Sequence, residues 1–116
     1  MGARWVQTQI LAQYPSAQLR VYAVWLPMLG GDRREAWNGT NMPDSRVIHF
    51  WDGDLELGQW FAKEVGGYEG VAWDVYYLYG PDAVWETVPA PLLGSGRTIY
   101  AERQTLKMQA GELLEE

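Results

Sequence analysis

The chain has 116 residues, close to the commonest size of one domain, so we expect a single domain over residues 1–116. Hydrophobic residues make up 47% of the sequence and charged residues 21%, a balance that excludes an intrinsically disordered chain and predicts a globular fold. The net charge of -6, from 9 basic and 15 acidic residues, argues against a nucleic acid or an anionic membrane as partner.

The sequence contains no cysteine, which excludes disulfides, thiolate metal sites and thiol redox chemistry for these residues. No segment approaches the roughly 20 apolar residues of a membrane span, and the first five residues lack the charged-then-apolar order of a signal peptide. We therefore expect the chain as given to be cytoplasmic. A lost upstream segment would change that expectation.

The first half of the chain alternates helical and strand patterns. Apolar residues recur at helical spacing over residues 4–14, and Pro15 disfavours continuation of this predicted helix. Residues 19–26 are almost continuously apolar and rich in β-branched and aromatic side chains, which is typical of a parallel strand covered on both faces. Residues 32–37 are predicted as a short helix with Asp32 as its N-cap, followed by a loop.

The second half begins with a further predicted buried strand over residues 46–51 and a turn after it. An apolar stripe over residues 57–65 predicts a helix that the next two glycines end. Alternation over residues 73–79 and an apolar run over 84–88 predict a β-hairpin with a turn of about four residues at Gly80-Pro81-Asp82. A loop at 89–96, a short strand at 97–100 and a C-terminal helix through Leu106 and Leu113 complete the pattern.

This order of elements resembles the later two thirds of a thioredoxin-like domain of the bacterial peroxiredoxin or thiol-disulfide reductase type. The resemblance is carried by residues 21–25 (VYAVW), 47–52 (VIHFWD) and 70–80 (GVAWDVYYLYG), together with the helix opening at residues 2–6. It covers nearly the whole chain. It implies an α/β fold: a thioredoxin-like mixed sheet of about four strands, with helices on both faces and the first central strand missing.

Two departures from the family decide what the resemblance implies for function. In the family, the first central strand and the redox cysteines precede the position of Gly2, so no catalytic residue carries over. The family also has a cis-proline ahead of the strand corresponding to residues 75–79, where this chain has Ala72 and Trp73. The resemblance therefore implies a redox-inactive derivative without a cofactor.

The missing strand also implies self-association. An open slot would leave buried backbone groups unpaired at about 1–3 kcal/mol each, against a domain stability of about 5–15 kcal/mol. The slot would close by pairing of residues 21–25 with residues 75–79, or by a strand from a second copy. Both routes favour a homodimer as the partner state.

His49 is the only histidine, and Asp52 and Asp54 follow it closely, as a general base or a metal site would need. Alternation places His49 and Asp52 on opposite sides of the strand, and no second imidazole exists. We therefore interpret His49 as a partly buried structural residue and predict no catalytic or metal site. A calcium-binding loop that begins at Asp52 is excluded, because its twelfth position needs a glutamate and is Lys63 here. We interpret Asp54 and Glu56 instead as acidic residues at a helix N-terminus, where negative charge is favourable.

Two further segments are candidate binding sites. Residues 30–34 (GGDRR) could hold an anion, but they lack the spacing of a phosphate-binding loop and carry the negative charge of Asp32, so a solvated turn is preferred. In the hairpin, alternation places Tyr77 on a core face and Tyr76 on the other. Trp73, Tyr76 and Trp85 are the candidate binding residues, because such rings combine apolar area with polar tips.

Three classes of function follow, and the first is preferred. It is a non-catalytic interaction domain that self-associates through its sheet or hairpin surface. The second is a small-molecule binding protein with an aromatic pocket between the hairpin at residues 73–88 and the first helix. The third is an enzyme that uses His49 with its acidic neighbours.

Overall fold

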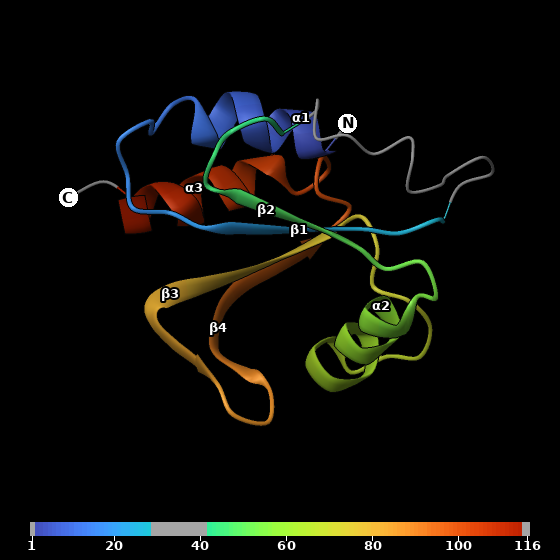
Figure 1. Cartoon of the computed structure of the whole chain (residues 1–116). Coiled ribbons are helices and arrows are strands. Elements are labelled where there is room, and N and C mark those ends of the chain that lie inside the picture. The colour runs from blue at the N-terminus through green and yellow to red at the C-terminus, as the bar shows by residue number, and fades with distance from the viewer. Residues whose placement is uncertain (1, 29–41, 115–116) are drawn as a thin grey trace. The chain divides into compact units, whose positions relative to one another are not determined.

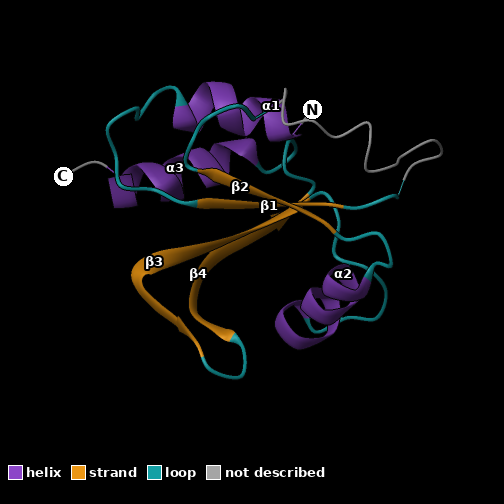
Figure 2. Cartoon of the chain, in the orientation of Figure 1, coloured by secondary structure: helices purple, strands orange, loops and turns teal. Residues whose placement is uncertain are grey.

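The computed structural model describes residues 2–28 and 42–114 (Figure 1). The elements in chain order are α1 (Gly2–Val6), the π-helical η1 (Gln7–Leu11), β1 (Val21–Trp25), β2 (Val47–Trp51), α2 (Glu56–Phe61), the π-helical η3 (Ala62–Gly66), β3 (Val75–Trp85), β4 (Pro89–Arg97) and α3 (Arg103–Leu114). The α/β class is confirmed (Figure 2). The predicted helix at residues 32–37 and the anion-site candidate at 30–34 lie outside the described residues.

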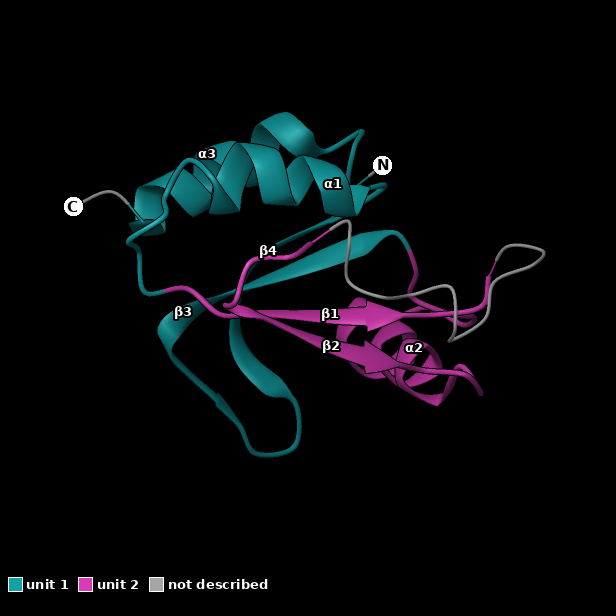
Figure 3. Cartoon of the chain, turned by 45° about the horizontal axis from the view of Figure 1, so that its top comes forward, with its two compact units in different colours: residues 1–18, 74–116 teal, residues 19–73 magenta. Residues whose placement is uncertain are grey.

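In place of the predicted mixed sheet of about four strands, the strands form two sheets of two strands each, β1 with β2 and β3 with β4. They belong to two compact units, Leu19–Trp73 and the combination of Met1–Gln18 with Asp74–Glu116 (Figure 3). The direct pairing of residues 21–25 with 75–79 that one closure route required is not formed. Each unit has its own buried apolar residues: Met42, Val47, Ala62 and Ala72 in the first, and Ile10, Leu11, Leu106 and Ala110 in the second.

The predicted N-terminal and C-terminal helices are confirmed as α1 with η1 and as α3, and they lie side by side (Figure 1). The first helix ends at Leu11 instead of residue 14. Lys107 Nζ on α3 donates to Gln9 Oε1 on η1 at 3.5 Å. Gly111 on α3 lies close to Tyr14, which follows the first helix: a Cβ added to Gly111 would be 3.3 Å from the Tyr14 hydroxyl. No helix in the described part of the chain is long and apolar enough to cross a membrane.

The hairpin exists, but its turn was predicted in the wrong place. β3 and β4 pair antiparallel with Val75 opposite Arg97 and Trp85 opposite Pro89, so the chain reverses at residues 86–88. Pro81 therefore lies inside a strand, where the register shift between Tyr79 and Val84 accommodates it as a bulge does. The expected loop at residues 89–96 is strand β4, and the expected strand after it is a turn.

In the unit of residues 19–73, β1 and β2 are parallel, as predicted, with Val21 opposite Val47 and Trp25 opposite Trp51. The helix predicted over residues 57–65 is confirmed as α2 with η3. The helix ends at Gly66, and the capping residue Gly67 has a φ of 74°, in the left-handed region that favours glycine.

Gly58 allows α2 to approach its neighbours closely. A Cβ there would lie 2.6 Å from Val71 Cγ1 and 2.7 Å from Leu26 Cδ2. The carbonyl of Gly58 also accepts a hydrogen bond from the amide of Ala72 at 2.8 Å. The helix is therefore packed on the end of β1 and on the segment that leaves the unit.

Candidate interaction surface

One face of the β1–β2 sheet is apolar and exposed. Tyr22 lies opposite Ile48 and Val24 opposite Phe50, and because side chains alternate along strands these four share a face. The exposed fractions are 60% for Tyr22, 48% for Phe50 and 37% for Ile48. The rings of Tyr22 and Phe50 are neighbours, with centroids 6.2 Å apart and planes inclined by 31°. We call these four residues the exposed sheet face.

The predicted coverage of β1 and β2 on both faces is therefore wrong. A continuous apolar run indicates that a strand needs cover, but it cannot show where the cover comes from. Tyr22 was the one available signal of exposure, since its polar tip tolerates water within an otherwise apolar strand.

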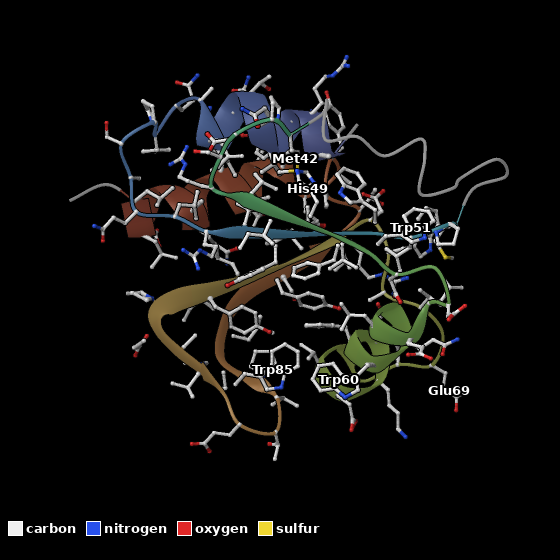
Figure 4. The ribbon with its side chains drawn as sticks, viewed as in Figure 1. Met42, His49, Trp51, Trp60, Glu69 and Trp85 are labelled. Atoms are coloured by element: carbon white, nitrogen blue, oxygen red, sulfur yellow. The ribbon has the colours of Figure 1, made fainter. Side chains whose placement is uncertain are left out.

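His49 lies on the other face of the sheet, and both of its ring nitrogens are hydrogen-bonded. Trp25 Nε1 donates to His49 Nδ1 at 2.9 Å. His49 Nε2 is 3.2 Å from the carbonyl oxygen of Met42, and the two residues are neighbours in Figure 4. An indole N–H can only donate, so Nδ1 accepts and Nε2 carries the proton that it donates to Met42. These bonds support the structural interpretation of His49, although the side chain is exposed instead of partly buried.

Asp52 anchors the start of α2, a role that the sequence analysis gave to Asp54. Asp52 Oδ2 accepts a hydrogen bond from the amide of Gly58 at 2.8 Å, whereas the N-cap position is Leu55, whose side chain caps nothing. Glu56 lies in the first turn, as expected. Within residues 2–28 and 42–114, no three His, Cys, Asp or Glu side chains gather where they could hold a metal ion.

An ion pair that the sequence analysis missed fixes the turn into β2. Arg46 Nε donates to Asp44 Oδ1 at 2.9 Å and Nη2 to Oδ2 at 2.8 Å, and the amide of Arg46 also donates to Oδ1 at 2.9 Å. The Arg46 guanidinium, its amide and its charge lower the pKa of Asp44 to about 2. An Asp two residues before an Arg, directly ahead of a strand, was the available signal.

Tyr76 does not lie on an open face. Its hydroxyl donates to Gln109 Oε1 on α3 at 3.2 Å, and its ring packs on Gly96, where a Cβ would come within 2.7 Å of it. Burial raises the pKa of the Tyr76 hydroxyl, and the negative charge of Glu102 adds to this. Gln109 packs in the same way on Gly94, so glycines of β4 give α3 room to cover this face of the hairpin.

The other two candidate binding residues lie apart from Tyr76. Trp85 is 54% exposed beside the exposed Val84, at the far end of β3 from Tyr76 (Figure 4). Trp73 is 40% exposed and is the last residue of the other unit. The structure does not bring Tyr76 and Trp85 together, and a ligand for the three residues stays a prediction.

The hairpin also buries tyrosine hydroxyls, including that of Tyr77, which alternation placed on a core face. The hydroxyl oxygens of Tyr77 and Tyr79 are closed to solvent, and burial raises the pKa of Tyr79. No protein-family model, curated protein or solved structure matches the chain.

Proposed function

We propose that this chain is a redox-inactive, thioredoxin-like interaction domain that self-associates to a homodimer. The observation that carries the proposal is the exposed sheet face, in which Tyr22, Ile48 and Phe50 leave 60%, 37% and 48% of their surface accessible. Contiguous exposed apolar side chains mark interaction sites in folded proteins, and aromatic residues are enriched at interface cores.

The chemistry of the face favours a protein partner. None of its four residues is charged, and the whole chain carries a net charge of -6, so phosphate recognition has no support there. A flat sheet face offers area instead of depth, which suits a second sheet or strand better than a small molecule. A second copy of the chain brings the same uncharged face.

The thioredoxin-like part of the proposal has separate support. In the described residues, the order of a helix, two parallel strands, a helix, a hairpin and a final helix agrees with the order on which the resemblance rests, apart from the helix predicted at residues 32–37, which lies outside them. The absence of cysteine supports a redox-inactive role, because thiol-disulfide exchange needs a thiolate.

Size-exclusion chromatography with light scattering tests the proposal. The wild type should have twice the 13.2 kDa mass of one chain at micromolar concentrations and dissociate on dilution. Tyr22→Gln should raise the dissociation constant about tenfold, since burying a large apolar side chain contributes about 1.5–3 kcal/mol.

Met108→Gln is the matched control, because Met108 is 59% exposed on α3 and lies outside the exposed sheet face. It should leave the dissociation constant unchanged. A wild type that stays monomeric throughout the micromolar range would contradict self-association. A dimer weakened by the Met108 change and not by the Tyr22 change would place the interface elsewhere.

A further inference from the structure

The backbone of β1 divides its hydrogen-bonding groups between two edges. The amide of Val21 donates to the Arg46 carbonyl at 3.1 Å, and the amide of Asp52 donates to the Trp25 carbonyl at 2.8 Å. In a parallel pair, every second residue of a strand bonds to the same neighbour. The residues of β1 at odd positions, including Ala23, therefore direct their backbone groups toward β2.

The residues between them direct their N–H and C=O groups to the opposite edge. These residues are Tyr22 and Val24, and no strand within residues 2–28 and 42–114 pairs with that edge. The outer edge of β2 differs, because the amide of Val47 already donates to the Asp44 carbonyl at 3.1 Å. An open strand edge of this kind is a template for pairing with another strand.

The sequence of β1 suits pairing with itself. Val21–Trp25 contains no charge, no proline and no glycine, so an antiparallel copy brings no like charges together and loses no donor. Its central residue, Ala23, is small, which matters where two strands of a symmetric pair approach most closely. Pro27 follows two residues after the strand and cannot donate, which limits how far the pairing could extend.

We propose that β1 pairs antiparallel with β1 of a second copy, about a twofold axis that passes beside Ala23. Tyr22 then lies opposite the partner subunit's Val24, and Val24 opposite the partner subunit's Tyr22, and each pair exchanges two N–H···O bonds. The sheet becomes four-stranded, with the two β1 strands at its centre and β2 at each edge. This inference rests on the proposed self-association and names the interface through which it occurs.

The same pairing joins the exposed sheet faces of the two copies. Tyr22 and Val24 lie on that face, so their opposition to the partner's Val24 and the partner's Tyr22 makes one continuous apolar surface. Two exposed two-stranded sheets are replaced by one larger sheet, and sheets of three or more strands are the ones with independent stability. A second copy of the chain therefore pairs with the open edge of β1 and at the same time extends the exposed sheet face.

Single-cysteine crosslinking tests the geometry, because the natural chain has no cysteine to compete. In the proposed dimer, Ala23 faces its own copy as a non-hydrogen-bonded pair with Cα atoms about 4.5 Å apart, within the range of a disulfide. Ala23→Cys should form a disulfide-linked dimer under oxidised glutathione. Val24→Cys is the matched control: its two Cα atoms would be about 8–9 Å apart, beyond disulfide reach.

We expect Ala23→Cys to crosslink at least tenfold faster than Val24→Cys. Equal rates, or faster crosslinking of Val24→Cys, would overturn edge pairing and indicate contact through the sheet face. A wild-type dimer in light scattering without Ala23→Cys crosslinking would also overturn edge pairing, while the proposed self-association would stand. A monomeric wild type would contradict both.

Amide hydrogen exchange on the wild-type chain tests the same geometry without a substitution. The amides of Tyr22 and Val24 should exchange more slowly as the protein concentration rises through the dimerisation range. The amide of Val47, which already has a partner in its own chain, should show no comparable change. Exchange at Tyr22 and Val24 that does not depend on concentration in a dimeric sample would refute the pairing.

Discussion

The carboxylate of Asp52 should contribute measurably to stability, although it lies three residues before the N-cap position of α2. Its Oδ2 accepts a 2.8 Å bond from the amide of Gly58, one of the amides at a helix start that lack a partner within the helix. Gly58 is buried, so its amide would lose a partner that water cannot readily replace. Asp52→Ala should therefore lower the free energy of unfolding by about 1–2 kcal/mol, as the loss of an N-cap does.

Urea denaturation followed by tryptophan fluorescence gives the measurement. Asp52→Asn keeps a carbonyl acceptor and loses only the charge, so its loss should be smaller, about 0.5–1 kcal/mol. Asp54→Ala is the control: this exposed carboxylate caps nothing, and its removal should change stability by about 0.5 kcal/mol or less. If the Asp54 change costs as much as the Asp52 change, general charge and not the bond to Gly58 stabilises the helix.

Three further predictions concern packing, pH and the hairpin. Gly58→Ala should destabilise the protein by about 1–3 kcal/mol by overpacking, despite the helix propensity of alanine; unchanged or higher stability in urea would show that the neighbouring methyl groups can move aside. Asp44 has its pKa lowered to about 2 beside Arg46, so its stabilising contribution is complete above the usual value of 3.8 and is lost as pH falls through about 2. Carboxyl NMR should find that low midpoint, and a midpoint near 3.8 would contradict the ion pair. Tyr76→Phe should cost about 0.5–1.5 kcal/mol in urea through the lost bond to Gln109, and no loss would mean that water replaces it.

The sequence predicted regular elements well where one periodicity dominated, and less well where turn residues lay within strands. The apolar stripe over residues 57–65 located α2 and η3, and of the two glycines after the stripe, Gly66 is the last helical residue and Gly67 caps the helix. Residues 80–82 (GPD) are a strong turn signal, yet they lie within β3, because an edge strand with register shifts tolerates a proline. The prolines and glycines of β4 are also turn-forming residues, and they led to the wrong prediction of a loop at residues 89–96.

The contacts of the candidate residues depended on pairings that one sequence does not reveal. Tyr76 was expected on an open face, but Gln109, far along the chain, covers it. Trp25 and His49 meet because β1 and β2 are in parallel register, and that register also places the partners of the His49 ring. Alternation can assign a side chain to a face, but only the packed helix decides whether that face is open.

The largest error, the expectation that β1 and β2 are covered on both faces, bears directly on the proposed function. A run such as Val21–Trp25 is apolar at every position, and a strand exposed on one side has no physical need for Tyr22 and Val24 to be apolar. The apolar pattern thus indicates that both faces of the sheet need to be covered. In the described residues, however, Tyr22 and Phe50 are exposed. Under the proposed dimer, the second copy removes part of that exposure. If light scattering and crosslinking both fail to find a dimer, a second copy of this chain does not provide that cover.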